Sequence, residues 1–394
     1  MKWRRPAIAF VNARVVTPGG GMASSIAVRG ARIETLGHPP SPHDVAIDLD
    51  GALVFPGLIN AHDHLELNSF PRLKWRDRHV NVREWIADFQ PRFTTDPALA
   101  AARPETLDDR VWVGGLKNLL SGVTTVCHHN PLHRVLCDRF PVRVVRKFRY
   151  SHSLQVDGDA VASVCHWTPP DWPWAIHAAE GIDDDASREI ETLEELKCLG
   201  SQTVLVHGIG ITASQSDRLL AQGVGLVWCP SSNHFLFGRT ADVRPFAACG
   251  RLALGTDSRL SGAGDLFDEM RAAAETRQVS SESIVRAVTA DAARMLRLPC
   301  AGRLEPGLPA DLTIVRSRRE SPYETLIAST RRDVRLTMVD GQPLVADEAM
   351  AAAFDASGAA DRARVDGEPR LLARWIARKV ARMQLGEPGL AVLG

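Results

Sequence analysis

Short runs of alternating apolar and polar residues occupy both flanks of the chain. On the amino-terminal side these runs are AIAFVNARVV, SIAVRGARIETLG and VAIDLDGALVF, which are separated by Gly, Pro and Asp. Similar runs return at 310–317 and 334–345, after the turn-like GRLEPGLPAD. Period-two alternation between turn residues predicts short β-strands. We therefore expect both flanks to be β-rich, and nothing in the first flank resembles a catalytic motif.

The middle of the chain alternates apolar runs with helix-like segments. The runs that predict strands are VFPGLINAHDHL, GVTTVCHH, VRVVRKFRY, WAIHAAE, TVLVHGIG, VGLVWCPSS and RLALGTDS. Alternation of this kind over roughly 250 residues is typical of a parallel β/α fold, and that length suits a closed (β/α)8 barrel. Most of these runs end in a polar residue of a type that can take part in catalysis. Because barrel active sites gather at the carboxyl ends of the strands, these endings indicate where the chemistry lies.

Residues 346–394 form a third region, which begins Ala- and Asp-rich and continues as RLLARWIARKVARM. In that last stretch apolar residues recur at helical spacing, namely Leu371, Leu372, Trp375, Ile376 and Val380. The spacing predicts an amphipathic helix that packs on the barrel or on a second subunit. A lid or a substrate-facing tail is the alternative.

Composition and charge narrow the class of protein. The 394 residues include 47 Lys plus Arg and 47 Asp plus Glu, so no excess charge favours nucleic acid or a membrane surface, and a small-molecule partner is expected. The seven cysteines never form CxxC, which argues against a disulfide framework and fits a reducing cytoplasm. The basic start is interrupted by Asn12 and Arg14 before a signal-like core develops, and no 18-residue apolar run occurs. The sequence leaves open whether the chain forms a homodimer.

The first chemical signal is the sequence His62-Asp63-His64, directly after an apolar run. On a strand the side-chain period is two, so both imidazoles project to the same face and can reach one ion. Two histidines on one strand form half of a metal site. Taken alone, such a pair is equally common in a structural role.

Three further residues, His177, His207 and Asp257, each follow a separate apolar run. A single histidine after a strand is usually an ordinary packed residue, and a single aspartate is often a helix cap. Their joint occurrence at the ends of barrel strands favours a metal centre instead. Imidazole nitrogens with one carboxylate suit one divalent ion, zinc or ferrous iron, with zinc preferred. Because a bound ion lowers the pKa of water toward about 7, hydrolysis is the expected chemistry.

Glu180 follows His177 by three residues, in HAAE. If the backbone turns after the strand, this carboxylate can shuttle a proton from water to a leaving nitrogen, whereas a helix-start glutamate is the structural alternative. His207 could bind the metal or hydrogen-bond the substrate atom that gains negative charge, and Asp257 could also act as base.

As a set, the motifs PGLINAHDHLE, HAAEG, VLVHGIG, WCPSSN and LGTDSRLSG resemble the amidohydrolase superfamily. Over roughly residues 8–345 the chain is most similar to its mononuclear deaminase and chlorohydrolase branch, which includes cytosine, guanine and adenosine-type deaminases. The resemblance implies a distorted TIM barrel over 56–303 and a small composite β-sandwich built from 1–55 and 304–345, with 346–394 as an extension. The metal ligands that it implies are His62, His64, His177 and Asp257. It also implies that Glu180 is the proton shuttle and that His207 orients the substrate.

The resemblance further favours one metal, because the carboxylated lysine of binuclear relatives has no counterpart between Ser151 and Pro173 and Lys147 falls on the third strand. Substrate contacts are less constrained by the motifs. The residues that we expect to make them are His152, His166, Trp167 and Asn233, with His128, His129 and His234 as further candidates. The Arg- and Trp-rich stretch 70–85 is expected to cover the site, with a solvated loop as its alternative.

The leading hypothesis is hydrolysis of a C–N bond in a small, heterocyclic substrate, with release of ammonia or an amine. Dechlorination or another non-C–N hydrolysis on the same scaffold is the first alternative, since only the leaving group changes. A barrel kept as a non-catalytic binding protein is the second. Such a protein should have lost metal ligands, whereas this chain retains all of them together with Glu180.

Overall fold

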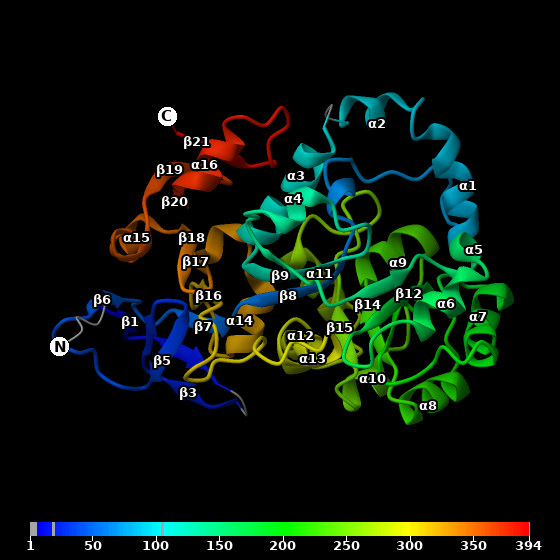
Figure 1. The fold of residues 1–394 in the computed structure, drawn as a ribbon, viewed down its shortest axis with the longest axis horizontal. Coiled ribbons are helices and arrows are strands. Elements are labelled where there is room, and N and C mark those ends of the chain that lie inside the picture. Colours follow the sequence, from blue (N-terminus) through cyan, green and yellow to red (C-terminus); the bar gives the residue numbers. More distant parts are fainter. Residues whose placement is uncertain (1–5, 18–19, 104–105, 394) are drawn as a thin grey trace.

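The computed structural model describes residues 6–17, 20–103 and 106–393. The basic start at 1–5 lies outside the described residues. In Figure 1 the amino-terminal strands (blue) and the carboxy-terminal elements (red) lie on the left, and the parallel strands with their surrounding helices lie on the right. The amino-terminal strands and the carboxy-terminal elements therefore lie on the same side of the molecule.

Eight strands of the described chain run parallel and coincide with the apolar runs of the middle region. They form two sheets, in the orders β10-β9-β8 and β11-β12-β13-β14-β15. The strands are β8 (Leu58–Asp63), β9 (Val123–His128), β10 (Arg143–Val144), β11 (Arg149–Ser151), β12 (Trp174–Ala178), β13 (Thr203–His207), β14 (Gly225–Trp228) and β15 (Leu252–Leu254).

Backbone hydrogen bonds join the two sheets at the end of β8. Asp63 and Asp257 form a parallel bridge, the Asp257 N–H donates to the His62 carbonyl over 3.1 Å, and the His64 N–H donates to the Asp257 carbonyl over 2.7 Å. Pairing thus runs from β11 through β15 and β8 to β10. Among the described residues no strand pairing joins β10 to β11, so the cylinder is open there.

The parallel strands are apolar on both faces because each face packs against a different core. Val204 and Val206 of β13 pack in one cluster, which also contains Ile59 and Ala175, whereas Leu205 packs in another with Leu226. Alternate residues of one strand therefore enter two cores. This arrangement explains why the runs read as continuous apolar segments rather than as alternating ones.

Helices follow or connect these strands, and several begin at side-chain caps that the sequence provides, such as Thr106, Asp183 and Thr212. The helices are α1 (Val82–Arg92), α2 (Pro97–Ala101), α3 (Leu107–Leu120), α4 (Arg134–Cys137), α5 (Leu154–Asp157), α6 (Ala160–His166), α7 (Asp184–Glu195), α8 (Ala213–Ala221), α9 (Pro230–Phe237), α10 (Arg244–Ala248), α11 (Leu266–Glu275), α12 (Ser281–Ala287), α13 (Ala290–Met295) and α14 (Pro322–Ala328).

The flanks form antiparallel-rich sheets, as their alternating patterns predict. One sheet has the order β5-β4-β1-β6, and a nine-stranded sheet of the described chain has the order β21-β19-β20-β18-β17-β16-β7-β2-β3. The amino-terminal strands are β1 (Ile8–Val11), β2 (Arg14–Val16), β3 (Met22–Ala23), β4 (Ile26–Arg29), β5 (Arg32–Leu36), β6 (Val45–Asp48) and β7 (Leu53–Pro56). The later strands are β16 (Leu312–Val315), β17 (Val334–Val339), β18 (Gln342–Ala346), β19 (Ala360–Val365), β20 (Glu368–Ala373) and β21 (Leu390–Val392).

The carboxy-terminal region differs from the single helix that its spacing predicts. Leu371 and Leu372 belong to strand β20, where they pair with Ala346 and Val345 of β18, and helix α16 begins only at Arg374 (Arg374–Val380). Cross-strand pairing of this apolar pair overrides the helical spacing. Together with α15 (Ala351–Ser357), the region extends the nine-stranded sheet beyond residue 345, so the predicted boundary there falls inside one sheet. Trp375 of α16 lies 6.0 Å from Trp112 of α3, measured between ring centroids.

All seven cysteines are free thiols. Among the helices that the structure describes, none combines the length and the hydropathy that a membrane span requires.

Candidate active site

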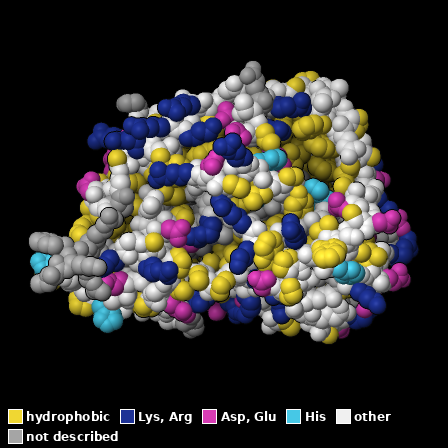
Figure 2. Space-filling view, viewed as in Figure 1, with side chains coloured by type: hydrophobic (Ala, Val, Ile, Leu, Met, Phe, Trp, Pro, Cys, Tyr) yellow, Lys and Arg dark blue, Asp and Glu magenta, His cyan; other side chains and the backbone are white. Residues whose placement is uncertain are grey.

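A cavity of about 360 Å³ lies at the carboxyl ends of the parallel strands. Its polar lining includes His64, His152, His177, Glu180, His207 and Asp257. Its apolar lining includes Leu67, Val82, Trp85, Ile86, Phe89 and Leu236. In the space-filling view hydrophobic side chains gather around a hollow beneath α2, between α3 and α1 (Figure 2). The strand ends thus supply the polar side of the cavity, and α1 supplies much of the apolar side.

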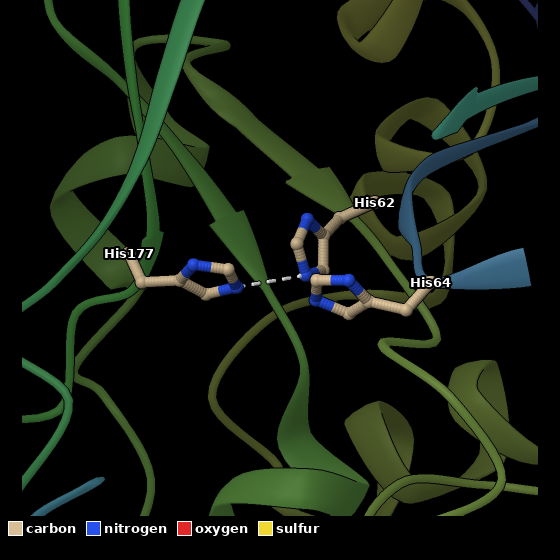
Figure 3. A group of neighbouring side chains, drawn as sticks. All are labelled: His62, His64 and His177. Atoms are coloured by element: carbon tan, nitrogen blue, oxygen red, sulfur yellow. Dashed lines mark hydrogen bonds between the residues drawn. The ribbon is translucent and has the colours of Figure 1, made fainter. Parts of the chain in front are cut away.

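Three histidines converge at the polar side. One ring nitrogen from each of His62, His64 and His177 lies within 4.8 Å of the others, and Figure 3 shows the rings turned toward one another. The two Nε2 atoms of His62 and His177 are 3.2 Å apart. Burial lowers the pKa of His62 and His177 well below the ordinary value, and the neighbouring histidines lower it further. These rings are therefore neutral and present lone pairs to a common point.

The orientation of the His177 ring is set by a hydrogen bond on the side that faces away from the other histidines. Its Nδ1 lies 2.7 Å from the carbonyl oxygen of His152, which can only accept, so Nδ1 carries the proton and Nε2 faces the other histidines. A hydrogen bond of this kind fixes the tautomer of a metal-binding histidine.

Asp257 brings a carboxylate to the same group. Its Oδ1 lies 3.6 Å from His64 Nε2 and 3.9 Å from His62 Nε2. Ser232 and Ser261 donate hydroxyl hydrogen bonds to Oδ2 over 2.7 and 2.6 Å, which leaves Oδ1 directed at the histidines. The residue adopts a φ of 57°, an uncommon backbone conformation for a non-glycine residue.

Close backbone approach explains the glycine of the LGTDS motif. A Cβ at Gly255 would lie 2.6 Å from the Cβ of His62 and 2.9 Å from its backbone nitrogen. Only glycine permits the strand that leads to Asp257 to pass this close to the strand that carries His62.

The side chains of Glu180 and His207 approach each other in the wall of the cavity. Glu180 Oε1 lies 3.5 Å from His207 Nε2, and both side chains are buried. Burial raises the pKa of Glu180 well above its usual range, and the carboxylates of Asp257 and Glu189 raise it further. The chain therefore holds a carboxyl group with a high proton affinity beside the histidine cluster, which is the property that a proton shuttle requires.

Asn233, a predicted substrate contact, does not line the cavity. Its Nδ2 donates to the His207 carbonyl and to Thr240 Oγ1, so its Oδ1 accepts from His207 Nδ1 over 2.8 Å. The pair assigns the proton of His207 to Nδ1 and directs Nε2 toward Glu180. Asn233 thus acts on the cavity through His207.

Two other predicted substrate contacts, His166 and Trp167, lie away from the cavity. Trp167 is 85% exposed, and His166 Nε2 lies 3.1 Å from the Leu196 carbonyl oxygen. Both residues end α6 and lead into the start of β12. Loops before a strand lie at the amino-terminal end of a barrel, so the structure does not bring these two residues into the lining of the cavity. His152, which directly follows β11, does line the cavity.

Of the remaining candidates, one lies beside the histidine cluster and two do not line the cavity. The ring centroid of His129 lies 4.4 Å from that of His177, and His129, His152 and His177 form a second group whose nitrogens lie within 4.8 Å of one another. His128 is buried near Glu66 and His234 does not contribute to the lining. The stretch 70–85 does lead into the cavity wall, but its contribution is Val82 and Trp85, whereas Arg76 and Arg83 pair with aspartates elsewhere.

Sequence reasoning missed a polar cluster behind the histidines. Lys117 and Asp63 are completely buried and lie 3.0 Å apart, with Asn60, Asn118 and Thr256 bonded to the same carboxylate. The available signal was Lys117 itself, a charged residue within the apolar segment VGGLKNLL of α3.

A comparison with known proteins finds a family match over part of the chain. Residues 171–344 match the sequence model of the amidohydrolase family. The chain carries an amidohydrolase family domain. This match confirms the resemblance predicted from the strand-end motifs. Among curated relatives, a 5-methylthioadenosine/S-adenosylhomocysteine deaminase of Halobacterium salinarum is 28% identical over 367 residues, which cover 77% of this chain and 84% of that protein.

Solved structures resemble the chain over most of its length. An adenosine deaminase from Xanthomonas campestris with bound zinc superposes with a TM-score of 0.72 at 18% identity, and the match covers 89% of this chain and 98% of that chain. An atrazine chlorohydrolase from Arthrobacter aurescens, complexed with zinc, gives a TM-score of 0.72 at 18% identity, and the match covers 89% of this chain and 99% of that chain. These likenesses show a TIM-barrel-type α/β fold.

Proposed function

We propose that this chain is a metal-dependent hydrolase of carbon–nitrogen bonds that deaminates a small heterocyclic substrate. The observation that carries the proposal is the convergence of three histidine nitrogens and the Asp257 carboxylate at one cavity, with Glu180 and His207 facing them. The deaminase names of the curated relatives support the reaction class.

The proposed metal ligands are His62, His64, His177 and Asp257, and the proposed ion is one divalent cation, zinc first and ferrous iron second. The donor set fits zinc, because ligand nitrogens at about 2.0–2.1 Å from a tetrahedral ion lie roughly 3.3 Å from each other. The His62–His177 separation is 3.2 Å. When bound, such a cation acidifies water and polarises the bond under attack.

The side chains around that site divide the remaining work. Glu180 holds and transfers a proton between water and the leaving nitrogen, which its raised pKa and its position in the cavity wall support. His207, held by Asn233 through Nδ1, directs Nε2 toward Glu180, and when the ring takes up a proton there it would donate a hydrogen bond to the substrate atom that gains negative charge. Asp257 is positioned to accept a proton from water through the oxygen that faces the histidines.

The substrate class follows from the relatives and from the apolar wall. The relatives are named as deaminases of 5-methylthioadenosine, S-adenosylhomocysteine and 5'-deoxyadenosine, so an adenine-like amino heterocycle is the first candidate. The stacked rings of Trp85 and Phe89, 5.0 Å apart, give the cavity a flat apolar side that suits a planar ring system. Dechlorination is the second candidate, because a solved neighbour is an atrazine chlorohydrolase.

The finer architecture belongs to the same proposal. We assign residues 56–303 to a distorted (β/α)8 barrel that opens between β10 and β11, and residues 1–55 with 304–345 to a composite β-domain, whose larger sheet continues into the strands after residue 345. The strand order around β8 and β15 and the shared sheet of β7 and β16 support this division.

The proposal is tested by metal analysis and by a substrate panel. Purified protein should contain about one zinc or iron ion per chain and should release ammonia from at least one adenine-type nucleoside or other aminated heterocycle. A parallel panel of chlorinated triazines, scored for chloride release, tests the alternative. His177→Ala is the matched control and should lose both metal and activity. Protein that folds normally, binds no divalent ion and gains no activity on metal addition would exclude the enzyme.

A further inference from the structure

We propose that Lys117 is a positioning residue, whose buried ammonium group holds together the two segments that carry the metal ligands. The inference rests on the proposed metal centre, which it deepens. Lys117 lies on α3, is completely buried, and does not line the catalytic cavity. Charged lysines are seldom buried without a partner, so the contacts of this group determine what it does.

Lys117 Nζ contacts three side chains from three parts of the site. It lies 3.0 Å from Asp63 Oδ2, 2.7 Å from Asn68 Oδ1 and 2.9 Å from Thr256 Oγ1. Asp63 stands between the ligands His62 and His64, and Thr256 directly precedes the ligand Asp257. One ammonium group therefore bonds to both ligand-bearing segments.

Asp63 is the centre of this cluster. Its side chain is completely buried and, unlike that of His64, does not line the cavity. Its Oδ2 accepts from Asn118 over 2.8 Å and from Asn60 over 3.0 Å, and its Oδ1 accepts from Asn68 over 2.8 Å. The only cation that these contacts bring to the carboxylate is Lys117, which balances its charge.

The cluster also fixes the second segment. Asn60 Oδ1 accepts from the Thr256 N–H over 3.1 Å, and Thr256 Oγ1 donates to Asp63 Oδ2 over 3.2 Å. Lys117 bonds to the same hydroxyl oxygen. The backbone that presents Asp257 is thus tied to the backbone that presents His62 and His64 by side chains on the far side of the strands.

Two roles for the ion pair can be separated by experiment. If Lys117 only balances the buried charge of Asp63, removal of both charges should restore the protein, since many buried ion pairs can be replaced by neutral groups without loss of stability. If Lys117 positions the ligands, removal of both charges should restore stability but not metal affinity. Groups that orient metal ligands usually change metal affinity by about 10- to 100-fold when mutated.

The experiment compares Lys117→Met, Asp63→Asn and the double variant. Cation affinity is measured for Zn²⁺ by competition with a chromophoric chelator, ligand geometry by the absorption spectrum of the Co²⁺-loaded protein, and stability by thermal melting of the metal-free protein. Lys379→Met is the matched control, because this lysine pairs with Asp109 of the same helix α3 over 2.9 Å but is remote from the ligands.

We expect the double variant to melt close to the parent protein, yet to bind Zn²⁺ about 10- to 100-fold more weakly and to give an altered Co²⁺ spectrum. Lys379→Met should leave affinity and spectrum unchanged. Recovery of affinity together with stability in the double variant would overturn the inference, as would parent-like affinity in Lys117→Met. If Lys117→Met does not fold, the double variant alone decides. Failure of the parent protein to bind Zn²⁺ would instead refute the proposed function.

Discussion

The two sides of the candidate active site are built in different ways. Behind the histidines, Asp63, Lys117 and Thr256 are completely buried and held by several side-chain hydrogen bonds. Opposite them, α1 has no buried residue, and it presents Trp85 and Phe89 as a stacked, half-buried pair. Directional polar bonds fix a position more narrowly than apolar contacts do. The comparison indicates that the ligand side sets the chemistry and the α1 side sets which substrate is accepted.

The largest effect is expected from a substitution of Glu180, which tests proton transfer separately from metal binding. Glu180→Gln keeps the size of the side chain but removes the acid–base group, so kcat should fall by about 10²- to 10⁴-fold. Metal content, measured by elemental analysis, should match that of the parent protein because Glu180 is not a proposed ligand. Normal turnover in this variant would make the glutamate structural and would remove the proton shuttle from the proposed mechanism.

A smaller effect is expected when the support of His207 is removed. Asn233→Ala takes away the acceptor of the Nδ1 proton, so the ring loses its fixed orientation and tautomer. We expect kcat/KM to fall by about 10- to 100-fold, the usual effect of removing a group that orients another. Steady-state kinetics check this value, and an unchanged kcat/KM would show that His207 is held by packing alone.

The apolar side should respond in KM rather than in kcat. Trp85→Ala removes one ring of the stacked pair, and we expect KM to rise about tenfold, equivalent to about 1.4 kcal/mol of lost binding. The kcat value should change by less than about threefold, because α1 contributes no proposed acid, base or ligand. A fall in kcat without a change in KM would contradict the division between the two sides of the site.

The smallest effect is expected at the opposite end of the barrel. Trp167→Ala changes a ring that is 85% exposed and lies outside the cavity lining. Both kcat and KM should stay within about twofold of the parent values, and stability should change by no more than about 0.5 kcal/mol. A marked loss of activity would mean that this surface contacts the substrate after all, and it would restore the prediction made from the sequence.

Strand ends could be predicted from the sequence, and the contents of the loops could not. His62, His177 and Asp257 each follow an apolar run, and hydropathy is sufficient to locate such positions. Trp167 also follows an apolar segment, but that segment is helix α6. The helices of a barrel run opposite to its strands, so the end of a helix lies at the other end of the barrel from the end of a strand. Apolar content alone does not distinguish the two cases.

The burial of the Lys117–Asp63 ion pair could not be predicted from the hydropathy pattern either. Lys117 occupies a helix, where lysine normally indicates the solvated face, and its partner Asp63 was read only as the spacer between two histidines. The pairing becomes visible only when α3 is packed against β9 and against residues 65–67, which follow β8. In the same way, the strand that contains Leu371 depends on a partner strand rather than on local spacing.

The shared sheet of the two chain ends has a consequence for biosynthesis. Strand β7, at Leu53–Pro56, hydrogen-bonds to β16, at Leu312–Val315, and β16 is followed in the same sheet by strands that reach Val392. A ribosome releases these partners in order, so the early strand emerges long before its neighbour exists. Contacts between such distant segments slow folding and leave an unpaired edge exposed in the meantime. One edge of β7 should therefore stay unpaired until the segment that contains β16 has been synthesised.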